Sequence, residues 1–138
     1  MRRYLIDTHI LIWLLSDDNK INWSIREDIE YFQHSYFVSV ESLREIVMLQ
    51  SLKKISISMD KAISYLQRFQ ITVLPIDITH VRALEQLPIV TIDGKQHLDP
   101  FDRMLIAQSM IEKYIIISSD HKFPFYQEHG LKLLVNEI

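Results

Sequence analysis

Residues 4–15 read YLIDTHILIWLL. The short apolar run at 4–6 predicts a buried strand, and the apolar residues from 10 to 15 predict a helix directly after it. Asp7 and His9 interrupt the apolar character between the two, and no small-residue cleavage site follows, so the segment is not a signal peptide. The sequence therefore predicts a strand that leads through an acidic residue into a helix.

The same alternation continues along the chain. We expect further strands near residues 36–38, 73–76, 114–118 and 131–135, and helices at 24–33, 40–52, 60–69, 79–86 and 100–113. Short apolar runs that alternate with longer helical stretches are typical of a parallel sheet with helices on its faces. The loop at 87–98 is polar, contains Gly94, and is a candidate border of a functional site. With 138 residues, the chain fits one domain, residues 1–138.

Composition excludes several classes of protein. Cysteine is absent, which rules out disulfides, zinc–thiolate sites, iron–sulfur clusters and cysteine nucleophiles, and suits a reducing cytoplasmic location. Gly94 and Gly130 are the only glycines, so neither a P-loop nor a dinucleotide-binding fingerprint is present. No apolar stretch approaches the about 20 residues needed to cross a bilayer, and we expect a soluble protein without a membrane partner.

Acidic residues stand where the chain changes direction. Asp7 and Asp120 each follow a predicted strand, and Glu45 and Asp102 lie near the starts of predicted helices. In a parallel sheet these positions share the edge at the carboxyl ends of the strands. Carboxylates gathered at one point repel each other by about 4 kcal/mol per pair at about 4 Å and an effective dielectric near 20, unless a cation lies between them. A magnesium-type metal site is the leading hypothesis, although the net charge of −3 argues against broad electrostatic capture of nucleic acid.

Each acid also has a purely structural explanation. Asp7 is a favoured type of helix N-cap, and Asp120 a favoured type of turn residue. Asp99 before Pro100 is best explained as an N-cap, whereas Asp102 shares a helical face with apolar residues and should point toward the sheet.

Two glutamates of one helix compete for the same role. Glu41 is explained by the helix macrodipole if Ser39 caps that helix, whereas Glu45 lies beyond its reach in an apolar stretch. We choose Glu45 and keep Glu41 as an accessory candidate. The histidines lack the i, i+4 spacing of a helical zinc site, and Thr8 and Ser118 are better placed to hydrogen-bond the carboxylates. Arg103 is a candidate phosphate contact, with an exposed helix-surface role as the alternative.

Several blocks of the sequence resemble the PIN-domain ribonucleases, specifically the VapC-like toxins of bacterial toxin–antitoxin pairs. They are LIDTHILIWLL, VSVESLREI, the LPI-D-x-T-H segment from Leu74, LDPFDRMLIAQ and IISSD. The family's acidic quartet falls on Asp7, Glu45, Asp102 and Asp120, and Ser118 takes a position usually held by Thr or Ser. Three positions depart from the pattern: Arg44 replaces a frequent Trp, Leu98 a frequent Arg, and Glu41 a small residue.

The resemblance implies a three-layer α/β/α PIN-like domain with a central, mainly parallel sheet. It also implies an Mg²⁺- or Mn²⁺-dependent endoribonuclease, a small antitoxin that covers the site, and a homodimer. Metal-assisted phosphodiester hydrolysis is the expected reaction, with Asp7 and Asp102 as direct ligands, Glu45 positioning metal or water, and Asp120 completing the cluster. The alternatives are a catalytically silent protein-binding module on the same scaffold and a metal-dependent DNA nuclease.

Overall fold

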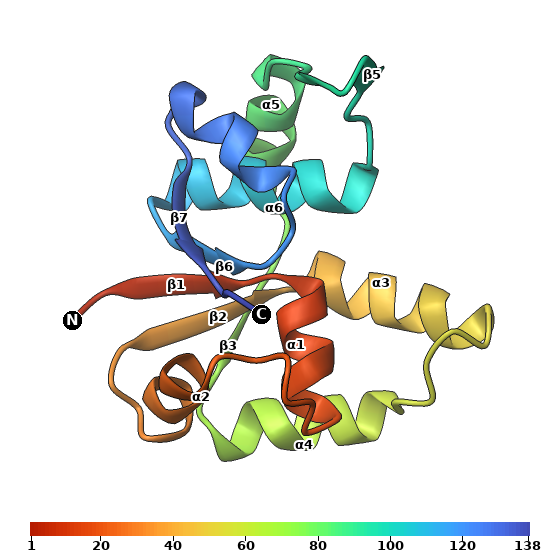
Figure 1. Ribbon diagram of the computed structural model, residues 1–138, viewed down its shortest axis with the longest axis vertical. Coiled ribbons are helices and arrows are strands. Elements are labelled where there is room, and N and C mark those ends of the chain that lie inside the picture. Colours follow the sequence, from red (N-terminus) through yellow and green to blue (C-terminus); the bar gives the residue numbers. More distant parts are fainter.

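A computed structural model describes residues 1–138 as a five-stranded parallel sheet and a small hairpin, with helices on both faces of the sheet (Figure 1). The sheet strands are β1 (Arg3–Ile6), β2 (Ser35–Ser39), β3 (Thr72–Leu74), β6 (Ile115–Ser118) and β7 (Lys132–Val135), and the hairpin strands are β4 (Thr91–Ile92) and β5 (Lys95–Gln96). The helices are α1 (Thr8–Leu15), α2 (Trp23–Glu30), α3 (Val40–Ser51), α4 (Met59–Arg68), α5 (Ile78–Gln86), α6 (Pro100–Glu112) and the 3₁₀ helix η1 (Phe123–His129).

The sheet has the strand order β3-β2-β1-β6-β7. From β1 the chain builds outward through β2 and β3, then returns to the other side of β1 and builds outward through β6 and β7. The direction of winding therefore reverses between β1 and β6, which pair directly, Tyr4 with Ile115 and Ile6 with Ile117. In open parallel sheets, ligands bind at such a switch point, beyond the carboxyl ends of the strands.

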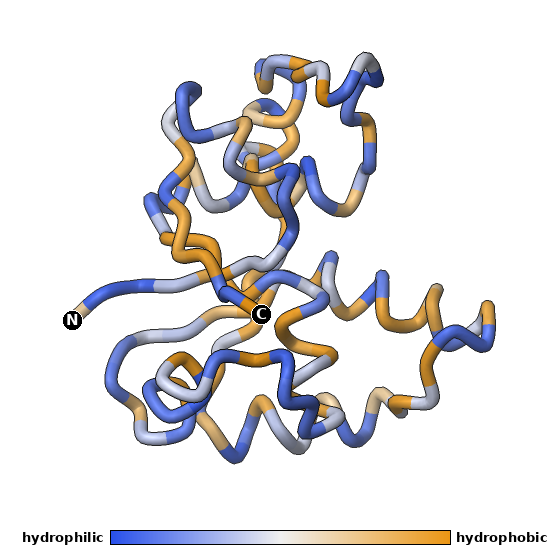
Figure 2. Tube along the Cα trace, viewed as in Figure 1, coloured by the Kyte–Doolittle hydropathy of each residue, from blue (hydrophilic) through white to orange (hydrophobic).

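The central strand supplies side chains to two separate hydrophobic cores. Tyr4 and Ile6 of β1 pack with α1, α2 and α4 on one face, and Leu5 packs with α6 and η1 on the other. Figure 1 shows α5, α6 and η1 on one side of the sheet and α1, α2 and α4 on the opposite side. Along the trace, β6 and α1 in the middle of the molecule are markedly more hydrophobic than the outer loops (Figure 2). Alternate residues of one buried strand therefore join the two outer layers.

The fold that the sequence predicts is confirmed: a three-layer α/β/α arrangement around a parallel sheet. Side chains cap helices at predicted sites, with Asp7 accepting from the amide of Ile10, Ser39 from Glu41 and Asp99 from Phe101 and Asp102. None of the helices combines the length and the apolar character that crossing a bilayer requires.

Three local expectations were incomplete. The third strand ends at Leu74 and not at residue 76, because Pro75 has no amide hydrogen for the ladder. The segment 87–98 contains the β4–β5 hairpin, whose turn has Asp93 at φ 51° and Gly94 at φ 78°. Asp-Gly is a favoured pair for such a turn, but two-residue strands leave no periodic pattern. The 3₁₀ helix η1 was not predicted either, since it has no extended amphipathic repeat.

Candidate metal centre

Asp7 lies directly beyond β1, at the switch point of the sheet. Its side chain is buried, its amide donates to the carbonyl of Ile117 at 3.1 Å, and its Oδ1 accepts from the amide of Ile10 at 2.9 Å. Burial raises the pKa of Asp7 to about 6, against the opposing effect of hydrogen bonds from Ser118 and Ile10, and the charge of Asp120 raises it further. Asp7 therefore caps α1 and also belongs to an acidic site.

Asp120 follows β6, the strand paired with β1. Its amide donates to Ser118 Oγ at 3.0 Å, and its Oδ1 accepts from the amide of Lys122 at 2.9 Å, so it shapes the turn as well. The Ser118 hydroxyl also lowers the pKa of Asp7, so Ser118 lies beside both aspartates. The structure brings both acids to one place because β1 and β6 are neighbours.

Glu45 comes from α3 and is buried, with 8% of its surface exposed. Its Oε1 is buried without any hydrogen-bond partner. Burial raises the pKa of Glu45, and a hydrogen bond from Thr8 opposes this effect. Thr8 Oγ1 also lies 2.9 Å from Ser42 Oγ, one turn before Glu45 on α3. An unpartnered buried carboxylate oxygen is costly, and a cation would satisfy it.

Asp102 is the residue on which the acids converge. Burial raises its pKa to about 8, and the charges of the neighbouring acids act in the same direction; in decreasing order these are Asp99, Asp120, Glu45 and Asp7. Its Oδ2 lies 3.1 Å from His97 Nε2. The four predicted acids therefore come from four segments of the chain and lie near enough for the charges of the other three to raise the pKa of Asp102.

The acids do not form a closed coordination shell as they stand. No three Asp, Glu, His or Cys side chains lie close enough together to hold a metal ion. The group nevertheless suits a hard divalent cation, because all its donors are carboxylate oxygens and one of them is orphaned. Protonation relieves part of the repulsion between these carboxylates, because the pKa values of Asp7 and Asp102 are raised.

The remaining sequence candidates take structural positions. Glu41 is buried and its Oε1 lies 2.7 Å from Arg44 Nη1, so two of the departures from the family pattern form an ion pair with each other. Asp99 caps α6 as expected. Arg103 is neither exposed nor directed to solvent: it is 9% exposed and donates to the carbonyls of Leu87 and Pro88 at 2.9 and 3.1 Å. Its placement offers no support for a phosphate contact.

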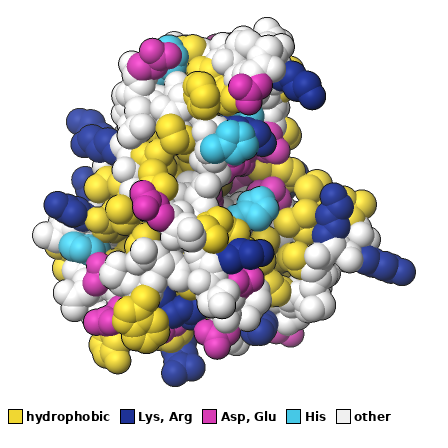
Figure 3. Space-filling model, viewed as in Figure 1, with side chains coloured by type: hydrophobic (Ala, Val, Ile, Leu, Met, Phe, Trp, Pro, Cys, Tyr) yellow, Lys and Arg dark blue, Asp and Glu magenta, His cyan; other side chains and the backbone are white.

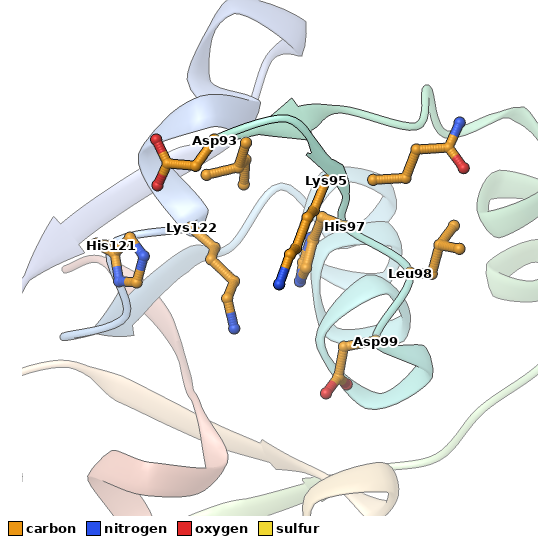
Figure 4. Close-up of a pocket in the computed structure, with 9 residues that line it drawn as sticks. Asp93, Lys95, His97, Leu98, Asp99, His121 and Lys122 are labelled. Atoms are coloured by element: carbon orange, nitrogen blue, oxygen red, sulfur yellow. The ribbon is translucent and has the colours of Figure 1, made fainter.

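A pocket of about 600 Å³ adjoins the acids (Figure 4). It lies between the β4–β5 hairpin and the turn after β6, with His97 and Asp99 in its wall. Lys95 and Lys122 extend into it from the two sides, and neither forms an ion pair with a carboxylate. On the face shown in Figure 3, basic, acidic and histidine side chains lie side by side around the hollow between the two helical layers. The pocket therefore contains two lysines without an acidic partner, beside the histidine that contacts Asp102.

Sequence reasoning set His97 aside with the other histidines and did not single out Tyr126. His97 bonds Asp102 through Nε2 and the Tyr126 hydroxyl through Nδ1, the latter at 2.8 Å. The signal for His97 was its position five residues before Asp102, beside the LDPFD block. Tyr126 gave no signal, because nothing local connects residue 126 with residue 97.

Comparison with solved structures identifies the class of fold. The chain is similar to chains in the DNA-bound VapBC of Salmonella typhimurium (17% identity, TM-score 0.67) and in VapBC2 of Rickettsia felis bound to a promoter DNA fragment (14%, 0.66). It is also similar to a chain of VapBC-5, a toxin–antitoxin system of Mycobacterium tuberculosis (15%, 0.59). The matches cover 98%, 98% and 100% of this chain, and 98%, 99% and 100% of the respective chains. No curated protein matches the sequence significantly.

The family follows from the sequence model of the PIN domain, which matches residues 4–128. The chain belongs to the PIN domain family, whose members are generally nucleases that depend on divalent metal ions. The resemblance drawn from the sequence blocks is thereby confirmed at the level of the family, and the fold is that of chains solved in VapBC complexes.

Proposed function

We propose that this protein is a metal-dependent endoribonuclease, the toxin of a toxin–antitoxin pair. The observation that carries the proposal is the convergence of Asp7, Glu45 and Asp120 on Asp102, with Glu45 Oε1 buried and unpartnered. Membership of a nuclease family supports the class of reaction, and the similarity in fold to chains of VapBC complexes supports the toxin role.

Asp7 and Asp102 would hold Mg²⁺ or Mn²⁺ directly, with Asp120 completing the site and Glu45 orienting metal or water. When bound, such an ion lowers the pKa of water and offsets charge on the phosphate oxygens. Thr8 and Ser118 lie beside Glu45 and Asp7, where their hydroxyls lower the pKa of these carboxylates and would help to keep them in place. Because no ligand set is closed in advance, the side chains must draw together around the ion.

The basic pocket supports a polyanionic substrate. Lys95 and Lys122 have no acidic partner within ion-pair distance and line a pocket together with His97, which contacts Asp102. They would bind phosphates of the strand next to the one that is cut, since ammonium groups interact with any nucleic acid backbone irrespective of sequence. RNA as the polymer is carried over from the family resemblance.

A protein partner is the second part of the proposal. The similar solved structures are of VapBC, and one of them is described as a member of a family of toxin–antitoxin systems. By analogy, a small cognate antitoxin would cover the acidic site of this chain, and two copies of the chain would form a homodimer. Copurification with the product of the neighbouring open reading frame tests the first point.

The deciding experiment is cleavage of an RNA pool by the purified protein with Mg²⁺ or Mn²⁺. Asp7→Asn and EDTA serve as controls, and single-stranded DNA is offered in a parallel reaction. We expect cleavage of RNA that both controls abolish. Cleavage of DNA alone would make the protein a DNA nuclease, and no cleavage of either polymer would leave a silent protein-binding module.

A further inference from the structure

We propose that Arg103, Tyr126 and His97 form a one-way chain of hydrogen bonds that holds Asp102 by its Oδ2 atom, which makes Tyr126 and His97 positioning residues for the metal site. The role at a metal site rests on the proposed function. The hydrogen-bond chain itself is present in the protein without a metal. It assigns a role to buried polar groups on which the proposed reaction does not otherwise draw.

The direction of the chain follows from its first member. Arg103 can only donate, and its Nη1 lies 3.2 Å from the Tyr126 hydroxyl oxygen. That oxygen is thereby an acceptor, and its own hydrogen remains to be donated. The nearest acceptor is His97 Nδ1 at 2.8 Å. Because a buried hydroxyl hydrogen without an acceptor is costly, the tyrosine donates to the histidine.

The state of His97 follows in turn. A ring nitrogen that accepts a hydrogen bond carries no proton, so His97 Nδ1 is unprotonated and Nε2 bears the hydrogen of the neutral ring. Nε2 lies 3.1 Å from Asp102 Oδ2 and donates to it.

Each member of the hydrogen-bond chain is held in place by its surroundings. Arg103 is fixed by the carbonyls of Leu87 and Pro88, and Tyr126 is fully buried in the 3₁₀ helix η1. His97 is 6% exposed and packs edge-on against the Tyr126 ring at 5.6 Å. The segment of His97 and the helix η1 thus support one contact, that of His97 with Asp102 Oδ2.

The consequence concerns the other oxygen. With Oδ2 occupied by His97, Asp102 keeps Oδ1 for an ion, and its side-chain rotation is limited before any ion arrives. Among four carboxylates that repel one another, a fixed member lowers the conformational cost of assembling the site. The chain therefore acts on metal affinity and on turnover, and not on binding of the substrate strand.

The first test uses nitrogen NMR of the imidazole rings in the metal-free protein at pH 7.5. We expect His97 with Nε2 protonated and Nδ1 unprotonated. Tyr126→Phe removes the donor to Nδ1 and should bring His97 into exchange between tautomers. Tyr114→Phe is the matched control, because Tyr114 is also buried but stacks on Phe37 and forms no hydrogen bond through its hydroxyl. A wild-type His97 protonated at Nδ1 would overturn the proposal.

The second test measures binding of Mn²⁺ alone by calorimetry. We expect Tyr126→Phe to weaken it about tenfold, in the range typical of groups that orient metal ligands, while Tyr114→Phe binds as the wild type does. In RNA cleavage, Tyr126→Phe should lower kcat and leave KM unchanged. Thermal unfolding shows whether Tyr126→Phe folds. If it does not, His97→Gln is measured in its place.

The two proposals fail in different ways. A Tyr126→Phe protein that is folded and binds Mn²⁺ as tightly as the wild type overturns the positioning role. If the wild type binds Mn²⁺ more tightly than Tyr126→Phe but cuts no RNA, the hydrogen-bond chain is supported and the nuclease function is refuted. A wild type that binds no Mn²⁺ overturns both.

Discussion

At the scale of single residues, Asp102 makes the metal-free protein sensitive to pH. Its pKa is raised from 3.8 to about 8, so between these values the folded state keeps a proton that the unfolded state has lost. The stabilising contribution of this proton is complete below about pH 4 and is lost as the pH rises toward 8. A bound cation would reverse this loss, because it favours the ionised carboxylates.

Asp102→Asn is expected to remove much of this pH dependence. Asparagine cannot ionise, and its carbonyl oxygen still accepts a hydrogen bond from His97. In EDTA at pH 8.5, the variant should unfold several degrees above the wild type, and the difference should shrink at pH 4.5. Thermal unfolding followed by circular dichroism measures it. Parallel pH profiles for the two proteins would contradict the raised pKa.

Glu45 and Glu41 differ in the contacts of their carboxylates. Glu45 has an unpartnered oxygen at the acidic group, whereas Glu41 is neutralised by Arg44. We expect Glu45→Gln to lower RNA cleavage about a hundredfold or more, and Glu41→Gln to keep it within a fewfold of the wild type. Initial rates at saturating Mn²⁺ measure both. Equal losses would show that Glu41 assists at the site.

At the scale of elements, the β4–β5 hairpin and the turn after β6 form the two walls of the basic pocket. The hairpin is short, and only Asp93 and Gly94 build its turn. It nevertheless places Lys95 opposite Lys122, and puts His97 within reach of Asp102. A small element therefore arranges both the expected substrate contacts and a metal-ligand contact.

Lys95→Gln and Lys122→Gln are expected to weaken substrate binding. Each should raise KM for RNA by about threefold to tenfold with kcat nearly unchanged, and should flatten the dependence of KM on salt, because a phosphate contact is lost. Lys61→Gln on α4, on the opposite side of the sheet, is the control (Figure 1). A lowered kcat with unchanged KM would place these lysines in the chemical step instead.

At the scale of the whole molecule, one sheet joins two hydrophobic cores. Leu5 and Ile6 are adjacent in β1, both fully buried, and point into opposite cores. The cores therefore lose their common wall together when the sheet unfolds. This predicts a single cooperative transition.

Leu5→Ala and Ile6→Ala test that expectation. Each should lower the free energy of unfolding by about 2–5 kcal/mol, the usual cost of such truncations in a packed core. Ile78→Ala, at a side chain 74% exposed, should change it little. Urea unfolding followed by tryptophan fluorescence and circular dichroism gives the values. Two separate transitions would show that the two layers unfold independently.

The sequence by itself predicted the five strands of the sheet and the six α-helices in their order along the chain, the caps at Asp7, Ser39 and Asp99, and a candidate acidic quartet. These features are local: periodicity and capping depend on residues a few positions apart, and topology carries the carboxyl ends of parallel strands to one edge. The positions of Asp7 and Asp120 follow from that topology.

Only the tertiary structure decided how the acids are held. The bond between His97 and Asp102, the inward direction of Arg103 and the orphaned Oε1 of Glu45 join segments whose contact has no local pattern. A buried polar group takes whichever partner packing brings within about 3 Å, and that choice depends on the whole core. The family pattern thus predicts which carboxylates meet, and the packing of η1 and the 87–98 segment decides that Asp102 Oδ2 faces His97.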